Sequence, residues 1–253
     1  MKQIVQKLLI SIVFGYILNA NEIIIDQTRL AEIKKLNVVL QDSALTIKGV
    51  IEKPESYIVK LEAKSPQGSQ NITAYLDKST SELYMGSAYD KNGKMITFPK
   101  DAKIINDGVA FSYGSGSKEI YLVTDPQCPY CGRFEKASHG KLEEYTVHVI
   151  LLPLSFHKKA PVMIEWIMRG KDETEKKARF SALMLKDSTE YQALIKDTKK
   201  PFMYSSEVQK YMQKSNHTSR ELDVRGTPAL YDAKFNPISQ DEVLKHTKTK
   251  KVK

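Results

Sequence analysis

The chain has 253 residues, which is enough for two modest domains or one large domain. Hydrophobic residues make up 41% and charged residues 27%, and this balance excludes a largely disordered chain. The net charge of +9 could attract an acidic partner, but the lysines are spread along the chain and no nucleic-acid-binding motif is present, so no nucleic-acid partner is expected.

Residues 1–20 have the pattern of a secretory signal peptide. Lys2 and Lys7 precede the mostly apolar run Leu8–Leu18, and Ala20 offers a small residue at a plausible cleavage position. The apolar run is shorter than the ~20 residues that a membrane-spanning helix needs. The sequence therefore predicts an exported protein, with an uncleaved membrane anchor as the alternative.

Residues 21–95 have the pattern of a small α+β domain. Apolar side chains at helical spacing predict a helix over 21–36. Alternating and β-branched runs then predict four strands, and turn signals lie at 65–68 and 90–93. The strands are expected at 45–51, 57–63, 71–76 and 82–89. A domain of this size buries little surface, so pairing with a second copy would help to stabilise it.

Residues 96–117 are predicted to be a linker, because Pro99 interrupts them and they end in the flexible run Gly114–Ser117. The pattern then changes to alternating strands and helices, which predicts an α/β domain over 118–246 and a basic tail at 247–253. Its expected elements are a strand at 118–124, a helix at 132–141, a strand at 146–152, a helical block at 158–219, a strand at 229–231 and a final strand and helix at 235–246.

Cys128 and Cys131 are the two cysteines of the chain. A disulfide-held scaffold would use more cysteines, and a zinc site would need further ligands at suitable spacing, so neither a metal nor a cofactor is expected. A helix that begins at Cys128 would stabilise its thiolate, and Pro129 suits the first helical turn. Cys131 lies one turn along and can attack a mixed disulfide at Cys128. Redox chemistry is favoured, and metal binding or a structural pair are the alternatives.

Thr227 and Pro228 form the second candidate site element. Pro228 enters an apolar strand, where proline removes a ladder hydrogen bond. A cis peptide bond in a tight loop is one solution, and a trans proline at the start of a strand is the commoner alternative. If this loop lay beside Cys128, its backbone groups could pair with an extended substrate.

Several other residues have simpler interpretations. Tyr130, between the cysteines, either contacts substrate or packs over the start of the helix. Trp166 is expected in the core of the helical block, and the charge run 172–179 is expected on an exposed helix. His139 and His157 are expected at the surface, and a place near the active site is the alternative for each.

The run Asp125–Cys131, with the sequence Asp-Pro-Gln-Cys-Pro-Tyr-Cys, resembles the thioredoxin-fold superfamily when it is taken together with Gly226–Ala229. The chain is most similar to the periplasmic DsbC/DsbG family of thiol:disulfide interchange proteins. The helical block that contains Trp166 and the stretch Leu83–Gly93 fit that family. The Cys-Pro-Tyr-Cys motif is closer to that of DsbG.

This resemblance implies a cystatin-like N-terminal dimerisation domain, a linker and a thioredoxin-fold domain with a helical insertion, assembled as a V-shaped homodimer. Cys128 would attack a substrate disulfide and Cys131 would resolve the intermediate. The substrate site would be bordered by Pro129, Tyr130, Thr227 and a cis Pro228.

The implied function is a periplasmic disulfide isomerase or reductase, which acts on unfolded or misoxidised exported proteins and is kept reduced by a DsbD-like membrane partner. The alternatives are an oxidase of the same fold, recycled by a DsbB-like partner, and a holding chaperone that uses the dimer cleft. Thioredoxin and DsbA carry a buried acid six residues before the nucleophile. Leu122 stands at that position here, which leaves Cys131 without a named proton carrier.

Overall fold

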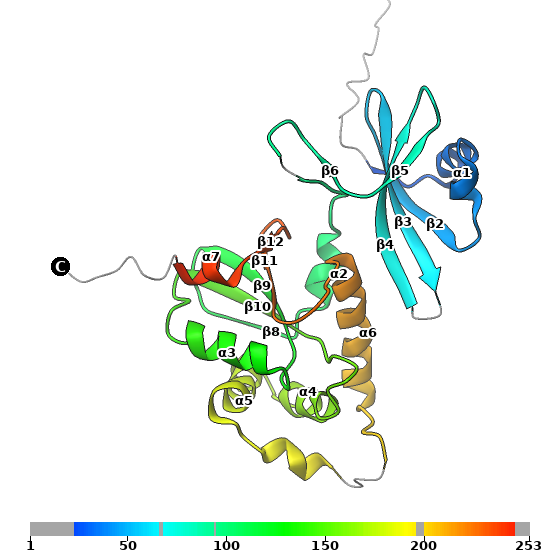
Figure 1. Ribbon diagram of the computed structural model, residues 1–253. Coiled ribbons are helices and arrows are strands. Elements are labelled where there is room, and N and C mark those ends of the chain that lie inside the picture. Colours follow the sequence, from blue (N-terminus) through cyan, green and yellow to red (C-terminus); the bar gives the residue numbers. More distant parts are fainter. Residues whose placement is uncertain (1–22, 66–67, 94, 196–199, 246–253) are drawn as a thin grey trace, which may run out of the picture. The chain divides into compact units, whose positions relative to one another are not determined.

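The computed structural model describes residues 23–65, 68–93, 95–195 and 200–245. The chain divides into two compact units, residues 1–98 and 99–253 (Figure 1). The predicted signal peptide at 1–20 and the basic tail at 247–253 lie outside the described residues. In the described ranges, no helix has the length and apolar character that crossing a membrane requires.

The first unit is one helix on an antiparallel sheet. Its sheet has the strand order β1-β2-β3-β4-β5, and β6 and β7 form a separate hairpin. The elements are β1 (Ile23–Ile24), α1 (Gln27–Lys35), the short 3-10 helix η1 (Val38–Gln41), β2 (Leu45–Glu52), β3 (Ser56–Ser65), β4 (Gly68–Asp77), β5 (Leu83–Met85), β6 (Ala88–Tyr89) and β7 (Met95–Ile96).

Helix α1 begins where the side chain of Asp26 accepts a hydrogen bond from the backbone N–H of Arg29, at 2.9 Å. Its buried side chains, Leu30 and Ile33, pack on the inner face of the sheet, where Val59 and Leu61 contribute to the same core. Strands β3 and β4 pair along their whole length, from Ser56–Asp77 to Ser65–Gly68. The predicted α+β pattern of this region therefore rests on one apolar helix stripe and one apolar sheet face.

Two elements of the first unit differ from the prediction. The helix expected over 21–36 begins at Gln27, because residues 23–24 pair with Ile51 and Val50 as strand β1. The strand expected over 82–89 is broken into β5 and β6 by Gly86, whose φ of 150° is a conformation that glycine adopts easily.

The second unit is a mixed five-stranded sheet with helices on both faces (Figure 1). The strand order is β12-β11-β9-β10-β8, in which β9 and β10 are parallel and the other pairs are antiparallel. The elements are α2 (Ala102–Asp107), β8 (Phe111–Tyr113), β9 (Lys118–Thr124), α3 (Pro129–Ser138), β10 (Tyr145–Leu151), α4 (Ala160–Met168), α5 (Glu173–Lys186), the 3-10 helix η2 (Glu190–Leu194), α6 (Ser206–Glu221), β11 (Ala229–Asp232), β12 (Pro237–Ile238) and α7 (Gln240–Lys245).

The two faces of this sheet have separate cores. Leu122 on one face packs in a cluster with Phe134 of α3 and Phe180 of α5. Val123 on the other face packs in a cluster with Ile105 of α2 and with Leu222, which follows α6. Consecutive residues of β9 thus point to opposite faces, and both are fully buried, as a central strand between two helical layers requires.

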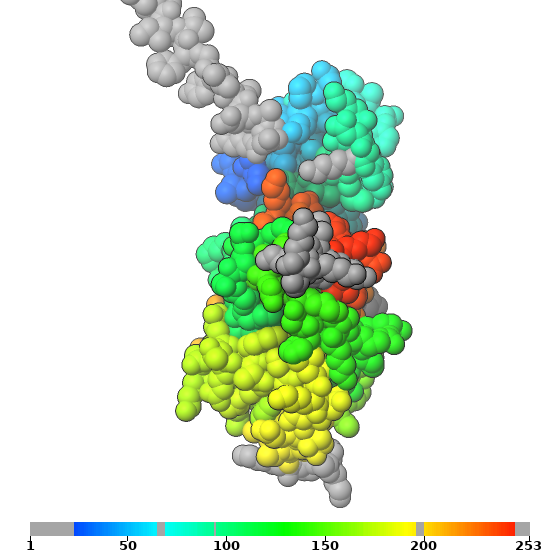
Figure 2. Space-filling model, turned by 90° about the vertical axis from the view of Figure 1, so that its left-hand side faces the viewer, coloured from blue at the N-terminus to red at the C-terminus, as the bar shows by residue number. Residues whose placement is uncertain are grey.

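The helical insertion, α4 to α6, lies between β10 and β11 in the chain. Its yellow residues gather at one end of the second unit in Figure 2. Trp166 is 9% exposed and belongs to the main core, as expected.

The predicted linker at 96–117 is wrong. It contains α2 and β8, and the second unit begins at Pro99 rather than at Lys118. Strand β8 pairs with β10, and the ring of Phe111 contacts that of Phe180 at 5.6 Å. With six and three residues, these two elements are too short to give a clear periodic signal in the sequence.

Candidate active site

Cys128 is the N-cap residue of α3. Strand β9 ends at Thr124, a short turn follows, and Pro129 occupies the first helical turn. The backbone N–H of Cys128 donates to the carbonyl of Asp125 at 3.0 Å, which closes the turn. The free N–H groups at the start of a helix, together with its dipole, stabilise an anion at this position. The Cys128 side chain therefore lies at the positive end of the α3 dipole.

Cys131 lies one turn farther along α3 and is 1% exposed. Burial is the main cause that raises the pKa of its thiol to about 12. The backbone N–H of Asp125, 3.5 Å from Cys131 Sγ, and the hydroxyls of Thr124 and Thr227 act in the opposite direction. Both cysteines are free thiols in this structure. At neutral pH, Cys131 is consequently held as a buried, protonated thiol.

Thr227 and Pro228 lie beside Cys128. The peptide bond between them is cis, and the Cys128 thiol donates to the carbonyl of Thr227 at 3.5 Å. The contact follows from the sheet, because β11 begins directly after Pro228 and pairs with β9, with Ala229 opposite Val123. The structure thus brings the two segments of the predicted site together across 99 residues of sequence.

The two motif residues between the cysteines are exposed. Tyr130 is 64% exposed, and the guanidinium of Arg133 lies 4.3 Å from the centre of its ring. Cys128 itself is only 5% exposed. The Tyr130 ring is therefore not buried over the start of the helix, and it lies at the surface.

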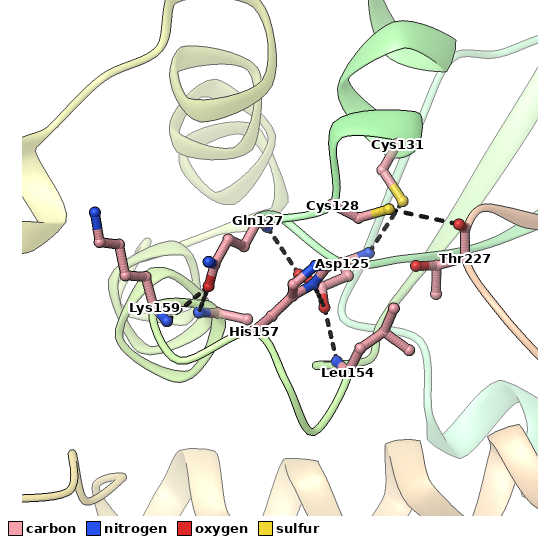
Figure 3. A network of polar contacts seen from close by, with 9 residues as sticks. Asp125, Gln127, Cys128, Cys131, Leu154, His157, Lys159 and Thr227 are labelled. Carbon is pink, nitrogen blue, oxygen red and sulfur yellow. Dashed lines mark hydrogen bonds and ion pairs between the residues drawn. The ribbon is translucent and has the colours of Figure 1, made fainter.

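A buried carboxylate lies three residues before Cys128. Asp125 Oδ1 accepts the backbone N–H of Gln127 at 2.8 Å, and Oδ2 accepts the N–H of Leu154 at 2.7 Å and Nδ1 of His157 at 2.8 Å (Figure 3). Gln127 Oε1 in turn accepts the backbone N–H groups of residues 159 and 160, at 2.6 and 2.9 Å. The active-site turn and segment 154–160 are thereby tied together by side chains.

The contact between Asp125 and His157 was not predicted from the sequence. His157 was expected at the surface, yet its side chain is 13% exposed and bonded to a carboxylate that is 0% exposed. The order of the strands is the feature that could have indicated this contact. Strands β9 and β10 are parallel neighbours, so the segments that follow their carboxyl ends lie at the same edge of the sheet. In the described ranges, no three His, Cys, Asp or Glu side chains are grouped closely enough to hold a metal ion.

A second buried ion pair lies under α3. Glu135 is 4% exposed and its Oε2 is 3.7 Å from Nζ of Lys177, whose charge also lies 3.5 Å from the ring centre of Tyr113. Burial raises the pKa of Glu135 and lowers that of Lys177. The expectation that residues 172–179 form a wholly exposed charged helix is therefore wrong at Lys177.

Comparison with known proteins agrees with this geometry. Residues 112–234 match the family described as the thioredoxin-like domain. A search of the curated proteins found no match to the chain. Several solved structures are similar to this chain at low identity, and the family match is the stronger of these two findings.

Three of these structures show the extent of the similarity. ScsC of Proteus mirabilis in a transitional conformation is 20% identical, with 57% of this chain and 74% of that chain covered and a TM-score of 0.42. A periplasmic thioredoxin-like protein of Salmonella enterica serovar Typhimurium is 18% identical, with 58% and 97% covered and a TM-score of 0.45. A disulfide interchange protein of Neisseria gonorrhoeae is 18% identical, with 56% and 96% covered and a TM-score of 0.36. Over residues 112–234, therefore, the chain is similar to the thioredoxin-like domain.

Proposed function

We propose that this protein is a thiol:disulfide oxidoreductase that uses Cys128 and Cys131 as its redox pair. The observation that carries the proposal is the position of Cys128, which caps α3 with its sulfur 3.5 Å from the carbonyl of Thr227 and next to a second free cysteine. A thiolate at a helix N-terminus is the reactive species of disulfide exchange, whereas a buried structural cysteine pair would not need that position.

The reaction takes place in two exchanges. The Cys128 thiolate attacks one sulfur of a substrate disulfide, forms a mixed disulfide and releases the other sulfur as a thiolate, which takes up a proton. Cys131 then loses its proton and attacks Cys128 Sγ, so that the second substrate sulfur leaves with its electron pair. The substrate disulfide is reduced and a Cys128–Cys131 disulfide is formed.

The order of attack follows from burial. Cys131 is 1% exposed and its thiol has a pKa of about 12, so it does not compete for the substrate. Pro129, Tyr130, Thr227 and Pro228 are the motif residues that border Cys128, and we propose that they contact the substrate chain. The exposed Tyr130 ring, next to the cis Thr227–Pro228 segment that precedes β11, suits an extended peptide better than a compact ligand.

Within this class we propose a periplasmic disulfide isomerase or reductase of the DsbC/DsbG type. It would act on misoxidised exported proteins, and a membrane partner would keep it reduced. We further propose that the first unit is a cystatin-like dimerisation domain, because a single helix on a small antiparallel sheet buries only a limited core.

Insulin reduction and refolding of a scrambled disulfide protein test the proposal. Cys128→Ala should abolish both activities, and Cys131→Ala should leave a protein that accumulates mixed disulfides. Full activity of Cys128→Ala in both assays would refute it. In cells, trapping of free thiols separates the two directions of electron flow: a mostly reduced pair supports the isomerase or reductase, and a mostly oxidised pair supports the oxidase.

A third outcome would favour a holding chaperone. If Cys128→Ala suppressed aggregation of an unfolded client as well as the parent protein does, and if cells that carry it had no defect, redox chemistry would not be the cellular role of the protein.

A further inference from the structure

Asp125 connects both cysteines to segment 154–160. Its backbone N–H donates to Cys131 Sγ at 3.5 Å, and its carbonyl accepts the N–H of Cys128 at 3.0 Å. Its carboxylate accepts hydrogen bonds from Gln127, Leu154 and His157 (Figure 3). The backbone of this residue therefore holds the redox pair, while its side chain holds the segment opposite.

The carboxylate belongs to the turn that carries the redox pair. It is one side chain away from the amide that contacts Cys131 Sγ, and it has no solvent exposure to screen it. Its field reaches other groups, because the Asp125 charge is one of the causes that raise the pKa of Tyr204. A negative charge near the redox pair disfavours a thiolate and so disfavours the reduced state.

His157 is the cation that can offset this charge. Its Nδ1 is 2.8 Å from Asp125 Oδ2, and it is the group with a chargeable nitrogen among the three donors to the carboxylate. The other two donors, from Gln127 and Leu154, are neutral backbone amides. An imidazole held in this way offsets the carboxylate when it is protonated, and a neutral replacement at this position cannot.

We propose that Asp125 and His157 are positioning residues that set the reduction potential of the Cys128–Cys131 pair through their summed charge. The inference rests on the proposed redox function and deepens it. Neither side chain reacts with the substrate. Asp125 lowers the potential by opposing the Cys128 thiolate, and His157 raises it by offsetting Asp125.

The test is the equilibrium of the pair with glutathione. Two glutathione molecules reduce the Cys128–Cys131 disulfide and become one glutathione disulfide. Of the two protons that they release, Cys131 binds one, and Cys128 leaves the other in solution when it remains a thiolate. Any change that stabilises this thiolate shifts the equilibrium toward the reduced protein and makes the pair more oxidising.

The two substitutions Asp125→Asn and His157→Asn change the charge in opposite directions. This holds for either protonation state of His157. In Asp125→Asn the net charge of residues 125 and 157 is equal to that in the parent protein or more positive. In His157→Asn it is equal to that in the parent protein or more negative. The two variants therefore differ from each other by at least one unit charge. We expect their equilibrium constants with glutathione to differ about tenfold, which is about 30 mV for a two-electron couple, with the parent protein between them or equal to one.

Matched controls use the same chemical changes on exposed side chains. His139→Asn and Asp187→Asn should leave the equilibrium constant within twofold of the parent value, since both residues are exposed. If the substitutions acted by loosening the active-site turn, the equilibrium constants of Asp125→Asn and His157→Asn would shift in the same direction. A shift of both variants to the same side, or a difference no larger than that of the controls, overturns the inference.

If Asp125→Asn does not fold, a second pair of variants tests the inference. His157→Lys restores a cation next to the carboxylate, and His157→Asn does not. The lysine variant should have the higher potential, and an equal or lower potential overturns the inference. If the parent protein does not exchange with glutathione at all, the proposed function fails instead, and the two failures are distinguished by this one measurement.

Discussion

Burial gives the two cysteines different properties. Cys131 is the more deeply buried of the two, and its thiol has a pKa of about 12. The hydroxyls of Thr124 and Thr227 lower that pKa, and neither has another hydrogen-bond partner within the described part of the chain. They are therefore free to donate to the sulfur when it becomes an anion, at the moment when Cys131 attacks the mixed disulfide.

Thr124→Val tests this role, because valine keeps the shape of threonine and lacks the hydroxyl. Loss of one hydrogen bond to a charged sulfur should slow release of glutathione from a Cys128–glutathione mixed disulfide about tenfold. The rate is measured by mass spectrometry of quenched samples. Thr146→Val is the control, because its hydroxyl bonds the carbonyl of Gly116 instead. An unchanged rate in Thr124→Val would show that the hydroxyl does not act on Cys131.

The raised pKa of Cys131 also predicts how stability depends on pH. The folded-state pKa of about 12 lies above the ordinary value of 9.0, so the stabilisation from the neutral thiol is complete below pH 9 and is lost as the pH rises toward 12. Urea unfolding of the reduced protein should show this loss between pH 9 and 11. In Cys131→Ala the loss should be smaller, and equal losses in both proteins would contradict the assignment.

At the scale of elements, the sequence was most informative where the apolar pattern was long. The central strands β9 and β10 were predicted because apolar and β-branched residues run along them, and the last five residues of β9 and the last three of β10 are buried. Strand β8 and helix α2 were missed because pairing and packing, rather than their own residues, hold them in place. The cysteine motif could be predicted because two cysteines one helical turn apart suit disulfide exchange. The Asp125–His157 contact depends on the order of the strands in the sheet, which residue spacing does not reveal.

The Glu135–Lys177 pair ties α3 to α5. Lys177→Met would leave Glu135 buried without its cation, and it should lower the free energy of unfolding at pH 7 by about 3 kcal/mol or more. Burial raises the pKa of Glu135 above its ordinary value of 4.5. The stabilisation from its neutral form is therefore complete below pH 4.5 and is lost as the pH rises through the folded-state pKa. The variant should therefore recover stability toward pH 4.

Urea denaturation measures this effect. The double variant Glu135→Leu with Lys177→Met should regain most of the loss, because it removes both buried charges. Lys136→Met is the matched control, since the Lys136 side chain is 54% exposed and should change stability by about 0.5 kcal/mol or less. A loss in the double variant as large as in Lys177→Met alone would contradict the role of the pair.

Replacing two glycines by alanine should change the stability of the protein in opposite directions. A Cβ on Gly108 would lie 2.2 Å from Thr218 Oγ1 and 2.7 Å from its Cβ, where α2 crosses α6. Gly108→Ala should therefore cost about 1–3 kcal/mol. A Cβ on Gly132, inside α3, would meet its nearest atom at 3.9 Å, so Gly132→Ala should stabilise the protein by about 0.5–1 kcal/mol. Thermal unfolding of both variants measures the difference, and equal shifts would refute the close contact.

At the scale of the whole molecule, the chain is two units with separate cores. The core of the first unit contains residues of α1 and of its own sheet, and the cores of the second unit begin at Ile105. The sequence predicted a change of pattern between the two, but it placed the second unit 19 residues too late, at Lys118 instead of Pro99. The chemistry and the proposed dimerisation are thus carried by different parts of the chain.

A fragment of residues 99–253 should separate these functions. It contains both cysteines, the cis Thr227–Pro228 bond and the whole five-stranded sheet, so it should fold and reduce insulin at a rate close to that of the full chain. If the first unit forms the dimer, sedimentation will show a monomeric fragment and a dimeric full chain. Refolding of scrambled disulfides should fall in the fragment, and a dimeric fragment would contradict the proposed role of the first unit.

Gln127 has a consequence for anyone who wishes to engineer this motif. Helix α4 begins at Ala160 without a side-chain cap from Lys159. The amide oxygen of Gln127 accepts hydrogen bonds from the backbone N–H groups of Lys159 and Ala160 instead. The residue directly before the nucleophile therefore caps a helix that begins 33 positions downstream. Replacing Gln127 together with the tetrapeptide Cys128–Cys131 should therefore fray that helix, so a foreign motif is best grafted with Gln127 retained.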